Sequence, residues 1–137
     1  MKRTDIRITA IHTAFTEEKF RTPLALSTGA IETITYAEIR IDAENRAGET
    51  AQGAGGVLLS DLWAFPSPDV DHAAKDRAMR DLVQLWADAL QADGGFADPF
   101  EHAHRMEAQM DELLREARSR CGLQKDIPRL AGLVALS

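Results

Sequence analysis

The feature that most constrains the fold is a change in the spacing of apolar residues about halfway along the chain. Near the start, Ile6, Ile8 and Ala10 are separated by the polar residues Arg7 and Thr9, which is the two-residue period of a strand with one solvated face. After residue 67, apolar residues recur every three or four positions, which is helical spacing. The sequence therefore predicts an α+β fold, with a three-stranded antiparallel sheet followed by a bundle of about three helices.

The sheet is expected to contain three strands, of which the last two are joined by a short turn. The first strand covers about residues 5–15, and its apolar phase slips after Ala10, which indicates either a bulge near Ala10 or the end of the strand. The second covers residues 31–42 and carries β-branched residues on one face. A polar turn follows, in which Asn45 is able to accept a left-handed conformation, and a third strand at about residues 47–51 completes the hairpin.

Each expected helix has a recognisable beginning or end. Residues 67–69, Ser-Pro-Asp, predict the start of the first helix, and the Gly-Gly pair at 94–95 predicts its end. Residues 98–99, Asp-Pro, start the second helix, with a glutamate in the capping-box position, and Cys-Gly at 121–122 ends it. A third helix is expected over residues 127–136.

Charge and composition exclude several classes of protein. The 137-residue chain has 16 Lys and Arg against 22 Asp and Glu, a net charge of −6, which disfavours a nucleic-acid partner. It contains no apolar run long enough to span a bilayer and no signal peptide, so we expect no membrane partner. A single cysteine, Cys121, allows no internal disulfide. We therefore expect a cytoplasmic protein.

No catalytic set can be assembled from these residues. His102 and His104 are two positions apart on a helix and would point in different directions. Asp69, Asp71 and His72 resemble a cluster for a hard cation, but carboxylates are also favoured at a helix N-terminus, and capping is the preferred interpretation. We expect no catalytic residue and no bound metal in this chain.

Two segments are expected to be long loops with unusual apolar content. Residues 16–29 are long for a hairpin connection. Residues 53–65 begin with a Gly-Ala-Gly-Gly run, which lacks the Lys and hydroxyl of a phosphate-binding loop and indicates a flexible hinge. Trp63 and Phe65 follow it and are costly to leave in water. Either these segments fold back into the core, or they form an apolar lid over something outside this domain.

The order of these motifs resembles the N-terminal capping domain of the enolase superfamily, in particular the mandelate racemase and muconate lactonizing enzyme group. The resemblance covers nearly the whole chain and is carried by short motifs at residues 2–7, 20–24, 34–39, 48–49 and 133–137.

The resemblance implies a domain that covers the mouth of a (β/α)₈ barrel and helps to select the substrate. Family members bind Mg²⁺ and remove a proton alpha to the carboxylate of a small-molecule substrate, as racemases, cycloisomerases or acid-sugar dehydratases. The metal ligands and acid–base residues would lie on barrel strands beyond Ser137. In this chain the resemblance points to substrate-binding residues in the two loops, namely Phe20, Arg21, Leu24, Ser27 and Trp63.

Two hypotheses follow for the chain as a whole. In the first, residues 1–137 are the capping domain of a longer protein, inactive alone, and residues 127–137 begin the link to the barrel. Its exposed lid loops and last apolar segment would then make the isolated chain self-associate. In the alternative, the chain is a stand-alone α+β protein–protein interaction module that homodimerises and has no catalytic activity.

Overall fold

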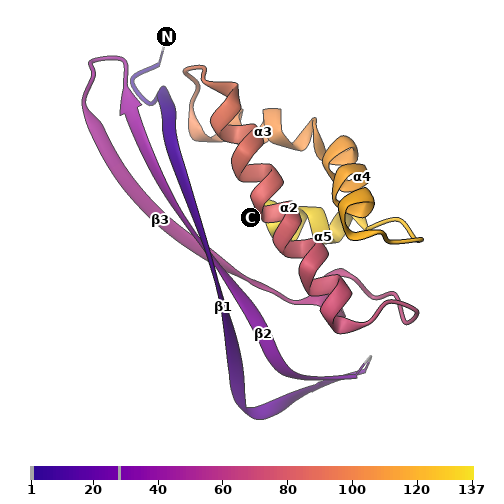
Figure 1. Cartoon of the computed structure of the whole chain (residues 1–137). Helices are drawn as coiled ribbons and strands as arrows, with labels where there is room; N and C mark the ends of the chain where they lie inside the picture. Colours follow the sequence, from indigo (N-terminus) through magenta and orange to yellow (C-terminus); the bar gives the residue numbers. More distant parts are fainter. Residues whose placement is uncertain (1, 28) are drawn as a thin grey trace.

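The computed structural model describes residues 2–27 and 29–137 and confirms the predicted α+β class. Figure 1 shows a long, twisted sheet along one side of the molecule and the helices gathered on the other. The sheet is antiparallel with the order β1-β2-β3. No helix among the described residues is long and apolar enough to cross a membrane. The elements are β1 (Ile6–Leu26), β2 (Gly29–Asn45), β3 (Thr50–Leu59), α1 (Asp61–Ala64), α2 (His72–Asp93), α3 (Pro99–Glu107), α4 (Met110–Cys121) and α5 (Arg129–Leu136).

The predicted loop at residues 16–29 is wrong, because most of this segment belongs to a long hairpin of β1 and β2. Pairing continues without interruption from Thr16 to Lys19, and it resumes at Leu24, which lies opposite Ile31. The interval between Lys19 and Leu24 contains Pro23, which has no N–H to donate to a ladder. The extra residues are therefore absorbed as an irregularity inside the strand rather than as a loop.

The predicted bulge near Ala10 is confirmed. Ile8 lies opposite Ala43, and Ala10 lies opposite Asp42, so Thr9 is the extra residue of β1. One inserted residue moves every later side chain to the other face, which explains the slip in the apolar phase.

The turn between β2 and β3 differs from the prediction in its detail. No described residue other than glycine has a positive φ, so Asn45 does not take the left-handed conformation that it is able to accept. Instead, Asn45 Oδ1 accepts hydrogen bonds from the backbone N–H groups of Ala47 (2.9 Å) and Glu49 (3.0 Å). Gly48 supplies the positive φ, at 82°, and β3 begins only at Thr50.

The glycine-rich segment at 53–56 is part of β3 and not a hinge. Gly53 lies opposite Ile41, and Gly55 lies opposite Ile39. At Gly56 an added Cβ would lie 2.2 Å from the Tyr36 hydroxyl oxygen, so the tyrosine ring covers this glycine. Pairing with the central strand thus overrides the low strand preference of glycine.

The third strand is much shorter than the hairpin beside it. Its pairing with β2 ends at Leu59, which lies opposite Thr35. Beyond that point β1 and β2 continue as a two-stranded ribbon toward residues 27 and 29. Figure 1 shows this ribbon extending past the end of β3.

The first long helix begins later than residues 67–69. Asp71 is the N-cap of α2, and its carboxylate accepts a hydrogen bond of 2.7 Å from the backbone N–H of Ala74. Ser67 instead accepts a hydrogen bond through its carbonyl from the Val70 N–H, so the Ser-Pro-Asp signal forms a turn before the helix. Gly94 ends α2 with a φ of 58°, as predicted.

The second predicted helix has the expected ends but is divided in the middle. Asp98 and Glu101 form the predicted capping box, and Gly122 ends α4 with a φ of 63°. Between α3 and α4 the backbone tightens, because the Gln109 N–H donates to the carbonyl of Met106, three residues earlier.

The core lies between the sheet and α2; α4 packs against α2, and α5 contacts α2, α4 and β3. Trp86 of α2 donates a hydrogen bond of 3.2 Å from Nε1 to the Gly132 carbonyl of α5. A Cβ at Gly132 would lie 2.3 Å from the Met110 sulfur, so this glycine lets α5 approach α4 closely. The largest fully buried side chains are Phe65, Leu59, Met79, Leu82, Met106, Met110 and Val83.

Candidate functional site

The two segments predicted to form a lid meet at one end of the molecule. A Cβ at Gly29, where β2 starts, would lie 3.6 Å from Leu62 Cδ2 of α1. Residues 30–33 of β2 and residues 61–62 of α1 line a common hollow of about 310 Å³. In Figure 1 this is the lower end of the molecule, where the hairpin ends. We call it the hairpin end.

Four of the predicted substrate-binding residues lie on the hairpin, in or just after β1. Phe20 is half-buried, Arg21 is exposed and Leu24 is 46% exposed. Ser27 is exposed and follows the last residue of β1. The fifth, Trp63, lies on α1 and is 59% exposed.

Part of the segment at residues 53–65 folds back into the core, and part of it stays exposed as a lid would. Leu59 and Phe65 are fully buried and complete the core, as the fold-back interpretation expects. Trp63 remains largely exposed on the short helix between them. Leu24 and Leu26 are exposed large apolar side chains of the hairpin, so apolar surface from both segments is open to solvent.

The hollow at the hairpin end contains charged residues that the sequence analysis did not single out. Asp61 is only 4% exposed, and its Oδ2 lies 2.9 Å from Nδ1 of His72. Lys75 is only 6% exposed, and its ammonium lies 5.8 Å from the centre of the Phe65 ring. Lys75 was detectable in principle, because it precedes Met79 by four residues on the buried face of α2.

The residues that resembled a cation cluster are held by other partners. Asp71 caps α2, which confirms the capping interpretation for this residue, and His72 contacts Asp61. Asp69 forms an ion pair with Lys125, whose ammonium lowers the pKa of the Asp69 carboxyl. The described residues contain no group of three or more His, Cys, Asp or Glu side chains that could hold a metal ion.

The buried histidine, His102, joins the start of β1 to α3. Its Nε2 lies 3.0 Å from the carbonyl oxygen of Ile6, and its Nδ1 lies 3.6 Å from Oδ2 of Asp93. Ile6 also pairs with Ala97, just before α3. These contacts fix the end of the molecule opposite the hairpin end.

Cys121 is not arranged as a nucleophile. Burial raises the pKa of its thiol, and the nearby Asp81 carboxylate acts in the same direction. The thiol donates a hydrogen bond of 3.2 Å to Asp81 Oδ2. A raised pKa keeps the sulfur protonated and therefore unreactive at neutral pH.

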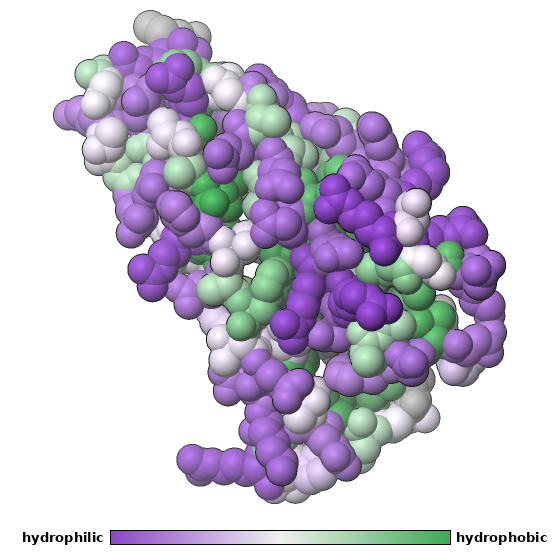
Figure 2. Space-filling view, in the orientation of Figure 1, coloured by the Kyte–Doolittle hydropathy of each residue, from purple (hydrophilic) through white to green (hydrophobic). Residues whose placement is uncertain are grey.

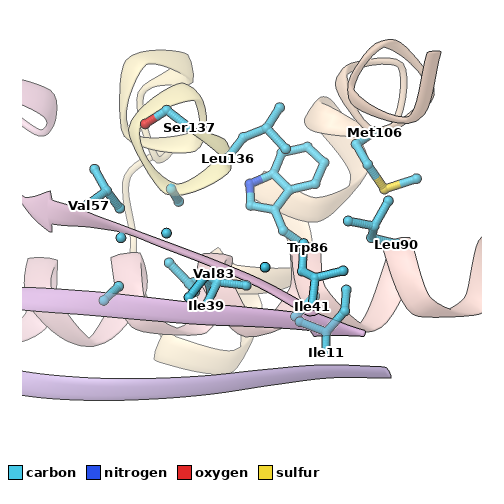
Figure 3. A pocket seen from close by; sticks show the side chains of 17 residues that line it. Ile11, Ile39, Ile41, Val57, Val83, Trp86, Leu90, Met106, Leu136 and Ser137 are labelled. Atoms are coloured by element: carbon cyan, nitrogen blue, oxygen red, sulfur yellow. The ribbon is translucent and has the colours of Figure 1, made fainter. Parts of the chain in front are cut away.

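A second, larger cavity is an apolar groove of about 390 Å³ between the sheet and the helices. Figure 3 shows Ile39 and Ile41 on the sheet side and Trp86 and Leu136 on the helix side. On the face that Figure 2 shows, hydrophobic residues appear in patches among mostly hydrophilic ones. The groove offers apolar surface but no acid–base group.

No protein-family model matches this sequence, and no curated protein matches it. Two solved structures are similar. One is a dipeptide epimerase from Enterococcus faecalis V583, complexed with Mg and the dipeptide L-Leu-L-Tyr, at a TM-score of 0.41 and 15% identity over 82% of this chain. The other is an enolase from Bradyrhizobium, complexed with magnesium and mandelic acid, at a TM-score of 0.40 and 16% identity over 83% of this chain. The chain spans only 25% and 26% of the length of those two proteins.

Proposed function

We propose that this chain is the N-terminal capping domain of a magnesium-dependent enzyme that removes a proton alpha to a carboxylate. The parent enzyme would be a racemase, a cycloisomerase or an acid-sugar dehydratase of the enolase superfamily. The observation that carries the proposal is the meeting of the hairpin end with α1 around one hollow. A cap that helps to select a substrate needs two such segments side by side at the surface that faces the barrel.

The chemistry of the hairpin end suits contact with a substrate that has a carboxylate and an apolar part. Arg21 provides a guanidinium, which binds carboxylates through two parallel hydrogen bonds. Ser27 provides a hydroxyl, and Phe20, Leu24 and Trp63 provide apolar surface. Covering this surface removes water from the site, which strengthens electrostatic interactions inside it.

The residues of this chain do not fit a magnesium site, and no chemical step is assigned to them. Asp69, Asp71 and His72 are engaged by Lys125, by the first turn of α2 and by Asp61 respectively. When bound in the parent enzyme, magnesium would stabilise the negative charge that develops on the substrate carboxylate. In this proposal the chain alone is inactive, and its share is to orient the substrate and exclude water.

The proposal extends to the organisation of the parent protein. Residues 1–137 would form the cap, and residues 127–137 would lead toward the barrel. The exposed apolar side chains of α5, Leu130 and Leu133, are consistent with a neighbour on that side.

The test is a calorimetric titration of Mg²⁺ into this chain and, in parallel, into the same chain extended through its natural reading frame. We expect binding heat only from the extended protein, because the metal ligands are proposed to lie in the barrel. Binding of comparable strength by the 137-residue chain would contradict the proposal and would move the metal to Asp69 and Asp71. A reading frame that closes directly after Ser137 would contradict it as well and favour the interaction module.

A further inference from the structure

We propose that Lys75 is the centre of an anion-binding site in the hollow at the hairpin end, and that this site takes the carboxylate of a small, partly aliphatic molecule. The hollow lies between the start of β2, α1 and the first turn of α2. Lys75 is outside the set of residues to which the sequence analysis assigned substrate contact.

The first reason is that the Lys75 ammonium has no counter-charge. The side chain is 6% exposed, and no described residue places a carboxylate oxygen within the 4.0 Å of an ion pair. The other buried acid of the hollow, Asp61, contacts His72 at 2.9 Å instead. The Phe65 ring, at 5.8 Å, compensates only in part for the missing counter-charge, and Lys75 Nζ is not among the fully buried side-chain atoms without a hydrogen-bond partner, so it keeps some contact with solvent.

The second reason is the shape and lining of the hollow. Its volume of about 310 Å³ is at the lower end of the range for small-molecule sites. Ala30, Ile31 and Leu62 supply apolar walls, while Thr33 and His72 supply groups that can form hydrogen bonds. The hollow therefore combines one cation with space for a short aliphatic chain.

The third reason is electrostatic, and it selects the class of anion. Asp61 and Glu32 also line the hollow, so a ligand with two negative charges would be repelled more strongly than one with a single charge. Lys75 lies in the first turn of α2, where the backbone N–H groups favour negative charge. A carboxylate with one negative charge is attracted to the start of α2 and is repelled less by Asp61 and Glu32 than a phosphate dianion is.

The biological role of this site rests on the proposed function, because the hollow lies at the end that is proposed to face the substrate. Binding itself does not depend on that function. A test that uses this chain alone and measures binding can therefore fail while the magnesium experiment succeeds, and the reverse is also possible.

The test is a titration of the ¹⁵N-labelled chain by NMR with three probes, which are isobutyrate, the neutral isobutyramide of the same shape, and inorganic phosphate. We expect isobutyrate to shift the backbone amide signals of residues 30–33, 62 and 72–75 along a saturating curve. Isobutyramide should leave them unchanged, and phosphate should bind at least about tenfold more weakly than isobutyrate. An equal response to isobutyrate and isobutyramide, a stronger response to phosphate, or no saturable shift would overturn the proposal.

Two variants and a matched control then identify the cation. Lys75→Met should weaken isobutyrate binding by about tenfold or more, and Lys75→Arg should retain most of it. Lys125→Met is the control, since it removes the same charge from an exposed site and should bind like the original chain. Unchanged binding by Lys75→Met would overturn the assignment. If that variant does not fold, the comparison of isobutyrate with isobutyramide on the original chain still decides the question.

Discussion

At the scale of single residues, the glycines of β3 have different roles although they are neighbours in the sequence. Gly56 lies under the ring of Tyr36, where an added Cβ would be 2.2 Å from the hydroxyl oxygen and 2.4 Å from Cζ. Gly53 and Gly55 have no atom within 4 Å of the position of a Cβ, and they line the apolar groove. Only at Gly56 does a close approach require the absence of a side chain.

We therefore expect Gly56→Ala to lower the free energy of unfolding by about 1–3 kcal/mol, because the methyl group forces the Tyr36 ring away from the sheet. Gly55→Ala is the matched control and should leave stability unchanged or raise it slightly, by up to about 1 kcal/mol. Urea denaturation followed by circular dichroism measures both. Equal losses in the two variants would show that the contact with Tyr36 is not the reason for the glycine.

At the scale of elements, the N-terminus of α3 is tied to the start of the chain by one lysine. The Lys2 ammonium lies 2.7 Å from Asp98 Oδ2 and 2.8 Å from Glu101 Oε1. These hydrogen bonds lower the pKa of both carboxyls from their ordinary values of 3.8 and 4.5. Reciprocally, hydrogen bonds to the two carboxylates raise the pKa of Lys2.

This arrangement predicts a stability that depends on pH on the acidic side. A carboxyl whose pKa is lowered in the folded state stabilises the fold above its ordinary pKa, and the contribution is lost as the pH falls through the folded pKa. The unfolding free energy should therefore fall more steeply below about pH 4.5 in the original chain than in Lys2→Met. Urea denaturation from pH 7 to pH 2.5 measures this slope.

The control for this experiment is Lys19→Met, at an exposed position of β1 that forms no ion pair with a described residue. Its stability should follow that of the original chain across the whole range. Parallel curves for the original chain and Lys2→Met would mean that the lysine does not hold these carboxyls in solution.

At the scale of the whole molecule, large apolar side chains are exposed on the hairpin and on α1. Leu24, Leu26 and Trp63 are 46%, 40% and 59% exposed. Both the capping proposal and the interaction-module alternative require a partner over this surface, and in the isolated chain a second copy can supply it.

We expect the isolated chain to self-associate, and Trp63→Ser to shift it toward the monomer in light scattering at matched concentrations. Phe100→Ser is the control, because Phe100 is 88% exposed but lies on α3, away from the hairpin end. If Phe100→Ser shifts the chain toward the monomer and Trp63→Ser does not, the contact between copies does not lie at the hairpin end. A monomeric original chain would contradict the expectation directly.

Local signals allowed much of the fold to be predicted. The capping box at Asp98 and the glycines at 94 and 122 act within one turn of a helix, so their sequence neighbours are sufficient. The bulge at Thr9 leaves a visible slip in the apolar pattern. The extent of β3 could not be predicted in this way, because its glycines are held in a strand by pairing with β2, which lies far earlier in the sequence.

The two segments that border the hollow could be singled out from the sequence, but most of the residues that line the hollow could not. The two segments around it were singled out by their apolar content, yet the hairpin part is a strand, and it is Leu62, not Trp63, whose side chain would lie within 4 Å of a Cβ at Gly29. Asp61 and Lys75 become candidates for a site only because both are buried and line the same hollow. Burial of a charged side chain depends on tertiary packing, which no local pattern encodes.

The short length of β3 has a consequence for how the hairpin end moves. Beyond the Leu59–Thr35 pair each strand of the hairpin has a single neighbour, so its end can unzip one residue pair at a time while the three-stranded part stays intact. The outermost steps, at the Leu26–Gly29 and Ala25–Ala30 pairs, break few hydrogen bonds, whereas a step past Ile31 uncovers a side chain that is only 5% exposed in the fold. We therefore expect the hairpin end to open gradually, pair by pair, rather than to switch between two conformations. Gradual opening of the outermost pairs would let it adjust to molecules of different length while the rest of the domain stays folded.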